Sequence, residues 1–196
     1  MMGQVATHTY ARDGIAPALH RGEGSTMASP EPPRDIFQPG GKPRPECLSE
    51  SATKVLSEAV RMARDTHWDS VRSPHLFMGL LAVPDAGVKR WGDRLGADLG
   101  KLLAQFQELF QQEDADRTAC LMLNREFLSD NVMRMLRESY TRAVAHHRST
   151  VNPMDLLITL LTANNSIVAE CFERIEVTAA KLTELAVLAE QETAQS

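Results

Sequence analysis

The sequence predicts an all-α fold made of two tandem copies of one four-helix unit, packed as a single pseudo-twofold domain. Residues 48–110 align with residues 128–190 without a gap and share fourteen identical positions, where roughly three or four are expected by chance. Apolar residues recur at the spacing of amphipathic helices, and no segment alternates as a strand does. The duplication defines repeat 1, about residues 48–112, and repeat 2, about residues 128–192.

The first helix of each repeat begins behind a serine, Ser49 or Ser129. A serine at this position accepts a hydrogen bond from a free backbone amide of the first turn. Each helix ends at a histidine, His67 or His147, where a donor can satisfy the terminal carbonyl groups. We therefore interpret these two histidines as structural residues.

The second helix of each repeat is short and almost entirely apolar, at residues 72–81 and 152–161, which is typical of a helix at the centre of a bundle. A third helix is predicted over residues 87–95 and 167–175. The fourth begins behind Asp98 or Thr178, both good N-caps. The polar residues 112–125 are expected to connect the repeats. One repeat alone is marginally stable, so we expect the two to share a core.

The segment before the repeats holds most of the proline and glycine, and no apolar periodicity runs through it. This composition predicts a disordered tail over residues 1–46, followed by the double-repeat domain at residues 47–192. Its basic and acidic residues balance, so the acidic excess falls on the domain. An alternative is that Asp35-Ile36-Phe37 forms a docking peptide within the tail. Met27 is an alternative translation start.

The overall composition excludes several classes of protein. A net charge of -5 disfavours binding through a phosphate backbone, so no nucleic-acid partner is expected. No apolar run reaches the roughly 18 to 20 residues of a membrane span, so no membrane partner is expected either. Three widely spaced cysteines, Cys47, Cys120 and Cys171, indicate a reducing compartment, and we expect a cytoplasmic protein.

Several motifs of the repeat resemble a known family. Each repeat begins with a short cap, Leu48-Ser49-Glu50 or Leu128-Ser129-Asp130. The apolar helix of repeat 1 reads Ser73-Pro74-His75-Leu76-Phe77-Met78-Gly79-Leu80-Leu81, and a Leu95-Gly96-Ala97-Asp98-Leu99 junction follows. In these motifs, their order and their period, the chain resembles the double-repeat N-terminal domain of the Clp/Hsp100 unfoldases. The resemblance covers about residues 47–192.

The resemblance implies a protein-binding module, because in the unfoldases these domains receive substrates or adaptor proteins and pass them to ATPase rings. The ATPase signature is missing here: Gly96 to Leu102 is one residue short of a phosphate-binding loop and ends in leucine. In some family members a glutamate of each repeat helps to hold the guanidinium of phosphoarginine. Those positions are Pro74 and Met154 here, so the paired carboxylates that such a cation needs are absent.

The loops that lead into the two apolar helices are the predicted partner-contacting edges. Tryptophan and arginine are enriched where interfaces concentrate their binding energy. The predicted partner-binding residues are Trp68, Arg72, Ser73, Pro74, Arg148, Asn152 and Met154. Trp91 is a further exposed candidate, and the alternative for Trp68 is that it closes the end of the bundle.

Catalytic or metal-binding chemistry is not predicted. No His-x-x-x-His or Cys-x-x-Cys spacing occurs, and no Ser/His/Asp or Cys/His set can be argued from spacing. His75 and Asp155 occupy equivalent positions, and the pseudo-twofold could bring them together in a polar contact, with a catalytic role as the alternative. We expect Cys171 in the core and Cys47 and Cys120 in flexible flanks.

The function that these observations favour is a stand-alone, non-catalytic Clp-repeat protein without a cofactor. Its partner would be a Clp ATPase, a protease subunit or a client polypeptide, and it would act as an adaptor, regulator or substrate receiver. One alternative is an accessory subunit that docks on a Clp protease core. A second is a small-ligand or enzymatic site near His75 and Asp155, which would need a closed polar pocket at the repeat interface.

Overall fold

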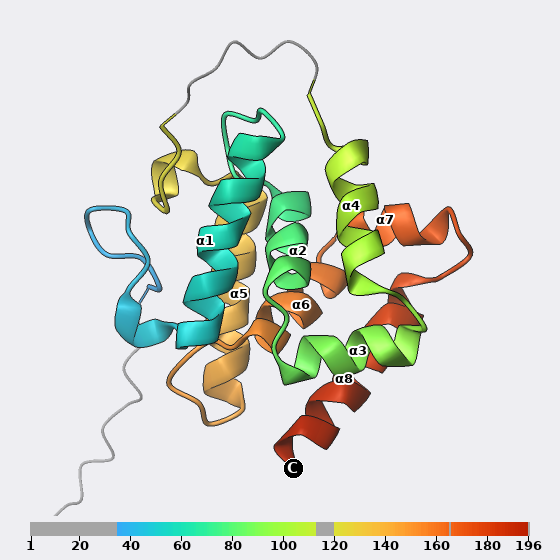
Figure 1. Cartoon of the computed structure of the whole chain (residues 1–196). Helices are drawn as coiled ribbons and strands as arrows, with labels where there is room; N and C mark the ends of the chain where they lie inside the picture. The colour runs from blue at the N-terminus through green and yellow to red at the C-terminus, as the bar shows by residue number, and fades with distance from the viewer. Residues whose placement is uncertain (1–34, 113–119, 165, 196) are drawn as a thin grey trace, which may run out of the picture. The chain divides into compact units, whose positions relative to one another are not determined.

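The computed structural model describes residues 35–112, 120–164 and 166–195 (Figure 1). The chain divides into two units, Met1–Pro32 and Pro33–Ser196, and every described residue belongs to the second. Repeat 1 contains α1 (Glu50–Asp65), α2 (Ser73–Ala82), α3 (Ala86–Leu95) and α4 (Leu99–Leu109). Repeat 2 contains α5 (Asp130–Ala145), α6 (Pro153–Thr162), α7 (Ile167–Glu173) and α8 (Ala179–Ala194). The predicted all-α fold with two four-helix repeats is confirmed.

The predicted helix starts are confirmed by side-chain caps. Ser49 Oγ accepts a hydrogen bond from the Ala52 amide at 3.1 Å, and Ser129 Oγ accepts one from the Val132 amide at 3.4 Å. Asp98 and Thr178 cap α4 and α8 in the same way. Each cap satisfies an amide that the helix itself leaves free.

The two recurring histidines end α1 and α5 through their backbone conformation. His67 has φ of 63° and His147 has φ of 57°, in the left-handed region that histidine adopts more readily than most residues. The turn lets the following amide reach back into the helix, so Trp68 N donates to the Ala63 carbonyl at 2.8 Å. The backbone therefore satisfies the terminal carbonyl groups, and not the histidine side chains as the sequence suggested.

The core lies around α2 and α6, which pack against α1 and α4 and against α5 and α8 respectively. Nearly every residue of both helices is buried. Four aromatic rings from different helices meet edge to face or tilted beside α2, with neighbouring ring centroids 4.8 to 6.3 Å apart; they are Phe77, Trp91, Phe106 and Phe172. Trp91 has no exposed surface, and its indole donates to the Leu182 carbonyl at 3.2 Å. The prediction of an exposed Trp91 is wrong, because α8 covers α3.

Two backbone bridges relate the repeats as the pseudo-twofold requires. Leu48 pairs with Val151, and Val71 pairs with Leu128. Adding 80 to either residue of repeat 1 gives its counterpart in the other bridge. The Ser49 amide donates to the Val151 carbonyl at 2.9 Å, and the Ser129 amide donates to the Val71 carbonyl at 3.0 Å. Each repeat thus starts its first helix on the loop of the other repeat.

The pseudo-symmetry is incomplete in the fourth helices. The helix α8 packs against both α3 and α6, whereas α4, its counterpart, packs against α2 (Figure 1). The helix α8 also has 16 residues and α4 has 11. The outer side of α7 is therefore covered less than the equivalent side of α3.

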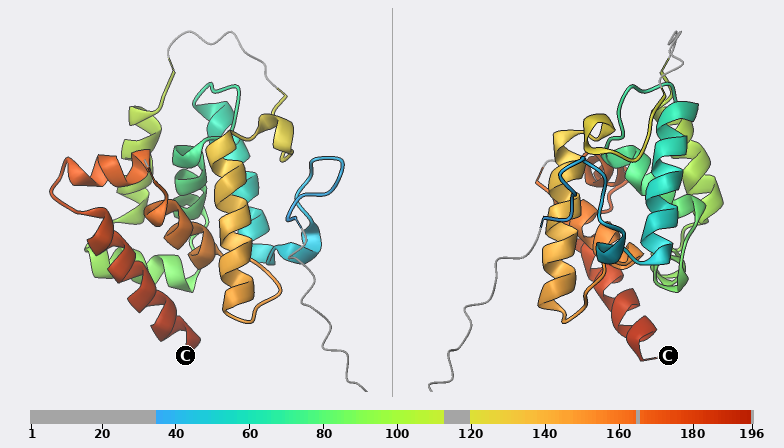
Figure 2. Two further views of the ribbon diagram at one scale, coloured as in Figure 1. Left: turned by 180° about the vertical axis from the view of Figure 1, so that it is seen from behind. Right: turned by 90° about the vertical axis from the view of Figure 1, so that its left-hand side faces the viewer.

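Residues 35–47, which we call the strap, correct the predicted domain boundary. Ile36 and Phe37 are 0% and 3% exposed and belong to the core. The strap runs beside α5 (Figure 2). Asp35 of the strap pairs with Arg137 of α5 at 3.1 Å, and the Arg137 guanidinium lies over the Phe37 ring. A disordered tail that reaches residue 46 is therefore wrong for residues 35–46, and the docking-peptide alternative fails because its apolar pair is already buried. Residues 1–34 lie outside the described residues.

The cysteines and the connecting segment differ in part from expectation. Cys47 is buried at 4% exposure, because the strap holds it against Val151, and not in a flexible flank. Cys120 is exposed and Cys171 is partly buried. Leu121, in the segment expected to be a polar connection, is 1% exposed, and its carbonyl accepts a hydrogen bond from Arg64. Residues 113–119 of that connection lie outside the described residues.

Candidate functional site

A cleft of about 320 Å³ opens where α2 begins, between the end of α4, the start of α5 and α7. Four of the seven predicted partner-binding residues line it. The cleft is lined by Trp68, Arg72, Ser73, Pro74, His75, Phe110, Ser129, Asn131, Ile167 and Glu170. Both repeats contribute, so the predicted edge of repeat 1 is one wall of a site between repeats.

Trp68 and Arg72 form the outer rim of the cleft. The Trp68 indole donates to the Phe110 carbonyl at 2.7 Å, and its ring meets the His75 ring edge to face at 5.6 Å. The Arg72 guanidinium lies over the Trp68 ring, 4.5 Å from its centroid, in cation–π geometry. Trp68 therefore closes the bundle end with one side and supports the exposed Arg72 with the other.

His75 holds the inner end of this rim. Its Nδ1 accepts a hydrogen bond from the Arg72 amide at 2.9 Å, which caps α2. Its Nε2 lies 3.2 Å from Thr66 Oγ1, which itself donates to the Met62 carbonyl. This network assigns the proton of the neutral ring to Nε2. Burial, and then the positive charge of Arg72, lower the pKa of His75 to about 4.

The stability of the domain is expected to depend on His75 at acid pH. The unfolded state binds a proton near the ordinary pKa of 6.5, and the folded state does so only near 4. The contribution of His75 to the free energy of unfolding is therefore complete above pH 6.5. It falls by about 1.4 kcal/mol per pH unit as the pH is lowered from 6.5 to about 4. Urea unfolding of the protein and of His75→Gln across this range measures the difference. Equal pH dependence in the two proteins would contradict the assignment.

The equivalent place in repeat 2 is filled by an ionic network. The carboxylate of Asp155, with 0% exposure, accepts hydrogen bonds from Arg142 at 2.5 Å and from Arg148 at 2.6 and 2.7 Å. It also accepts the Asn152 amide, while Asn152 caps the Asp155 amide. Glu190 of α8 pairs with Arg142 from the other side. Arg148 and Asn152, both predicted to contact a partner, are therefore engaged inside the domain.

Met154 also lies in the core and not at an edge, since it is 3% exposed. Its side chain packs over Gly87, where an added Cβ would lie 2.5 Å from Met154 Cγ. The counterparts of these two residues are Pro74 and Ile167, which line the cleft. The cleft is open in repeat 1 because the proline is short, and its counterpart in repeat 2 is closed because methionine fills the space above a glycine.

His75 and Asp155 are not brought together. His75 bonds to Thr66 and the Arg72 amide, whereas Asp155 bonds to arginines of its own repeat. Glu170 is the only carboxylate that lines the cleft among the described residues. Nowhere in the described ranges do three or more His, Cys, Asp or Glu side chains gather as metal ligands would.

The helices of the described part of the chain are all too short or too polar to cross a bilayer.

Sequence reasoning missed the walls of the cleft that come from other elements. Phe110 follows α4, Asn131 lies in the first turn of α5, and Ile167 and Glu170 lie on α7. One local signal was available: Ile167 is an apolar residue at the first position of a helix capped by Ser166, where no core contact is required. The approach of three distant segments depends on packing between the repeats.

The fold is a helical domain of two four-helix repeats. A similar solved structure is the N-terminal domain of the caseinolytic protease associated chaperone ClpD from Arabidopsis thaliana. The likeness has a TM-score of 0.58 at 17% sequence identity and covers 74% of this chain and 96% of that chain. No protein-family model matches the sequence, and no curated protein matches it. The similarity therefore concerns the fold.

Proposed function

We propose that this domain is a protein-interaction module of a Clp-type chaperone–protease system, and that a polypeptide partner enters the cleft beside Trp68 and Arg72. The observation that carries the proposal is the open cleft between the repeats. Its rim presents an arginine stacked on a tryptophan, and its walls include Pro74, Phe110 and Ile167. Aromatic and arginine residues around an apolar hollow are typical of the anchor points of protein interfaces.

The dimensions and chemistry of the cleft suit one or two side chains of a polypeptide. Its volume of about 320 Å³ is at the lower end of the range for ligand pockets. The exposed Arg72 and Glu170 offer one charge of each sign, and the Ser129 and Asn131 side chains offer hydrogen bonds. This function needs neither a catalytic residue nor a cofactor.

The partner that we propose is a Clp ATPase, a protease subunit or a client polypeptide, and the chain would act as an adaptor, regulator or substrate receiver. The fold of the ClpD N-terminal domain supports this assignment, because ClpD is described as a chaperone associated with the caseinolytic protease. We also propose a cytoplasmic location. The three cysteines are unpaired, as is usual in a reducing compartment.

Photocrosslinking from the cleft tests the proposal. Benzoylphenylalanine replaces the exposed Asn131 at the cleft, and in a matched control it replaces Ser51, the exposed equivalent in repeat 1. Irradiation in cells should crosslink a chaperone, protease subunit or unfolded client from position 131 and not from position 51. Arg72→Glu should reduce the yield. Identical products from both positions would contradict the cleft as the site.

The same crosslinks separate the two forms of the proposal. A regulator or substrate receiver should give several products, whose yields change when clients accumulate. An accessory subunit should give one protease-core product and should co-migrate with the protease ring at a fixed stoichiometry.

A further inference from the structure

We propose that the face formed by α4 and α7 is a second binding surface, and that it takes an amphipathic helical segment with basic side chains along its polar edge. This inference rests on the proposed function in one respect, which is that the molecule bound is a polypeptide. Its groove shares no lining residue with the cleft beside Trp68 and Arg72, although α7 borders both.

A groove of about 300 Å³ runs between the start of α4 and the end of α7. Its apolar lining comes from both repeats, chiefly Leu95, Leu102, Phe172, Ile175 and Val177. A second hollow continues along α4 at Gln105, Glu108 and Leu109, and Gln105 lines both. The two hollows therefore follow one side of α4, whose 11 residues span about 16 Å.

The exposed apolar side chains of the domain gather on this face. Five large hydrophobic residues are exposed in the described part of the chain, and three of them lie on α4, on α7 or in the turn after α7. Leu109, which is 55% exposed, and Ile175, which is 66% exposed, line the two hollows, whereas Ile167, at 41%, lines the cleft at the start of α7. Single exposed apolar residues are ordinary, but a cluster beside a groove marks a contact surface.

The pseudo-twofold explains why this face is open. On the equivalent face, α8 packs over α3, and Trp91 anchors it through the Leu182 carbonyl. The counterpart of Trp91 is Cys171, which is too small to reach across to α4 in this way. The helix α4, the counterpart of α8, contacts α7 through Phe106 and Phe172 but leaves a groove between the start of α4 and the end of α7.

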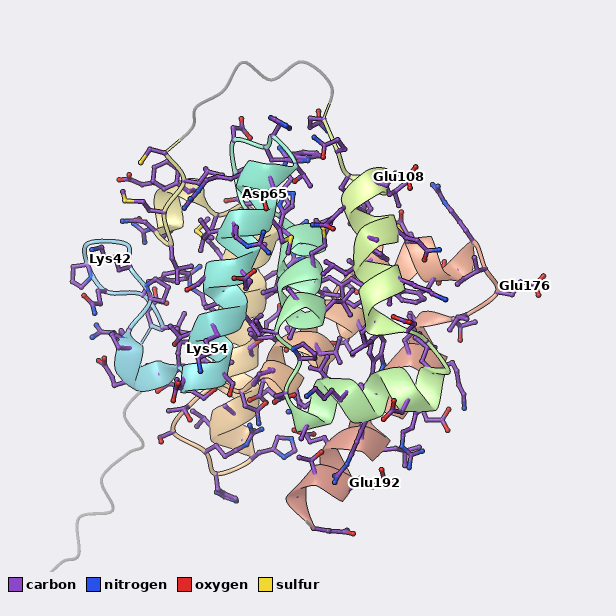
Figure 3. The ribbon with its side chains drawn as sticks, in the orientation of Figure 1. Lys42, Lys54, Asp65, Glu108, Glu176 and Glu192 are labelled. Atoms are coloured by element: carbon purple, nitrogen blue, oxygen red, sulfur yellow. The ribbon has the colours of Figure 1, made fainter. Side chains whose placement is uncertain are left out.

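The charges around the groove select a basic occupant. The exposed charged residues of this face are Asp98, Glu108, Glu173 and Glu176 against Lys101 and Arg174. In the described part of the chain, no ion pair joins any of the three glutamates. Figure 3 shows Glu108 at the end of α4, where it lines the second hollow, and Glu176 beyond α7, between Ile175 and Val177 of the groove, so acidic groups lie beside both hollows. Such a border attracts and orients a basic partner.

A helix is the occupant that fits both properties. A segment of three to four turns with one apolar face matches the length of α4 and would place its side chains at helical spacing in the hollows. Lysine or arginine residues beside that apolar face would then lie opposite the glutamates. An acidic segment would meet like charges along the same border.

The test uses a fluorescein-labelled 14-residue peptide with leucines on one helical face and lysines on the other. Fluorescence anisotropy with the full-length protein should show binding that weakens when salt is raised. A peptide with glutamate in place of each lysine should bind at least about tenfold more weakly. Ile175→Lys should also weaken binding of the lysine peptide by about tenfold or more, because it removes an apolar contact and adds a repelling charge.

Val144→Lys is the matched control, since Val144 is also an exposed apolar residue, at 44%, but lies on α5. Val144→Lys should leave binding of the lysine peptide unchanged. Arg72→Glu in the cleft should also leave it unchanged, so this test distinguishes a failure of the second surface from a failure of the proposed function. Equal binding of the two peptides, or unchanged binding by Ile175→Lys, would overturn the proposal. Self-association that Ile175→Lys abolishes in sedimentation would overturn it in favour of a second copy of the chain.

Discussion

Replacing Asp155 by asparagine is expected to lower the free energy of unfolding by about 3–5 kcal/mol. The side chain is completely buried, and its two oxygens receive three arginine hydrogen bonds and the Asn152 amide. Asparagine keeps the shape but removes the charge, so Arg142 and Arg148 lose the fully buried one of their two shared counterions and keep only Glu190. Urea unfolding followed by circular dichroism measures the change.

Asp35→Asn serves as the control for this prediction. Asp35 also pairs with an arginine, Arg137, but both side chains of that pair are nearly half exposed. Exposed pairs of this kind contribute less than about 1 kcal/mol. If the two substitutions had equal effects, the burial of the Asp155 network would not be what stabilises repeat 2.

Replacing Gly79 by alanine is expected to destabilise the domain by about 3 kcal/mol, although alanine favours helices more than glycine does. Gly79 lies where α2 touches α1, and an added Cβ would lie 2.5 Å from the Val55 carbonyl oxygen and 3.0 Å from the Ala59 amide nitrogen. Both obstacles are backbone atoms of a helix, so the two helices would have to separate. Thermal unfolding measures the loss.

Gly92→Ala gives the matched comparison. A Cβ at Gly92 would also meet an atom at 2.5 Å, but that atom is Cδ2 of the partly exposed Leu99 side chain. A side chain can turn away, so the cost should be clearly smaller than at Gly79. An equal cost at the two positions would show that the contact between α1 and α2 is less rigid than these distances imply.

The features of the fold that depend on local chemistry could be predicted from the sequence. The caps at Ser49, Ser129, Asp98 and Thr178 start helices where they were expected. The repeat period also predicted the pseudo-twofold. A helix cap is formed by residues within the first turn of the same helix, and a repeat period can be found by comparing the sequence with itself. Neither feature depends on the tertiary fold.

The features that failed depend on contacts between distant segments. Trp91 follows Lys89 and Arg90 in the sequence, and only the packing of α8 over α3 shows that it is buried. The strap has the composition of a disordered segment, yet one apolar pair, Ile36 and Phe37, finds a place in the core. Composition averages over a segment, whereas burial is decided by single side chains.

The sequence indicated one wall of the candidate cleft, because that wall comes from a single segment of the chain. Trp68, Arg72, Ser73 and Pro74 are close in sequence and line one wall of the cleft together. Their counterparts in repeat 2 occupy the same alignment positions but lie in a different environment, because Asp155 replaces His75 and Met154 replaces Pro74. Because Asp155 is a buried carboxylate where His75 is a neutral ring, Arg142 and Arg148 turn toward the inside of repeat 2 to pair with it. The spacing of residues in the sequence does not predict this pairing.

The closed counterpart of the cleft has a consequence for valency. A duplicated domain with two equivalent sites could bind two partners, or one partner in two orientations. Here Met154 over Gly87 removes the second site, so each chain offers one cleft, with the end of α4 on one side and the start of α5 on the other. A partner that enters this cleft, as we propose, is held there in a single polarity. After the duplication, the position before α2 has kept an open cleft, whereas Met154 has closed the equivalent position before α6.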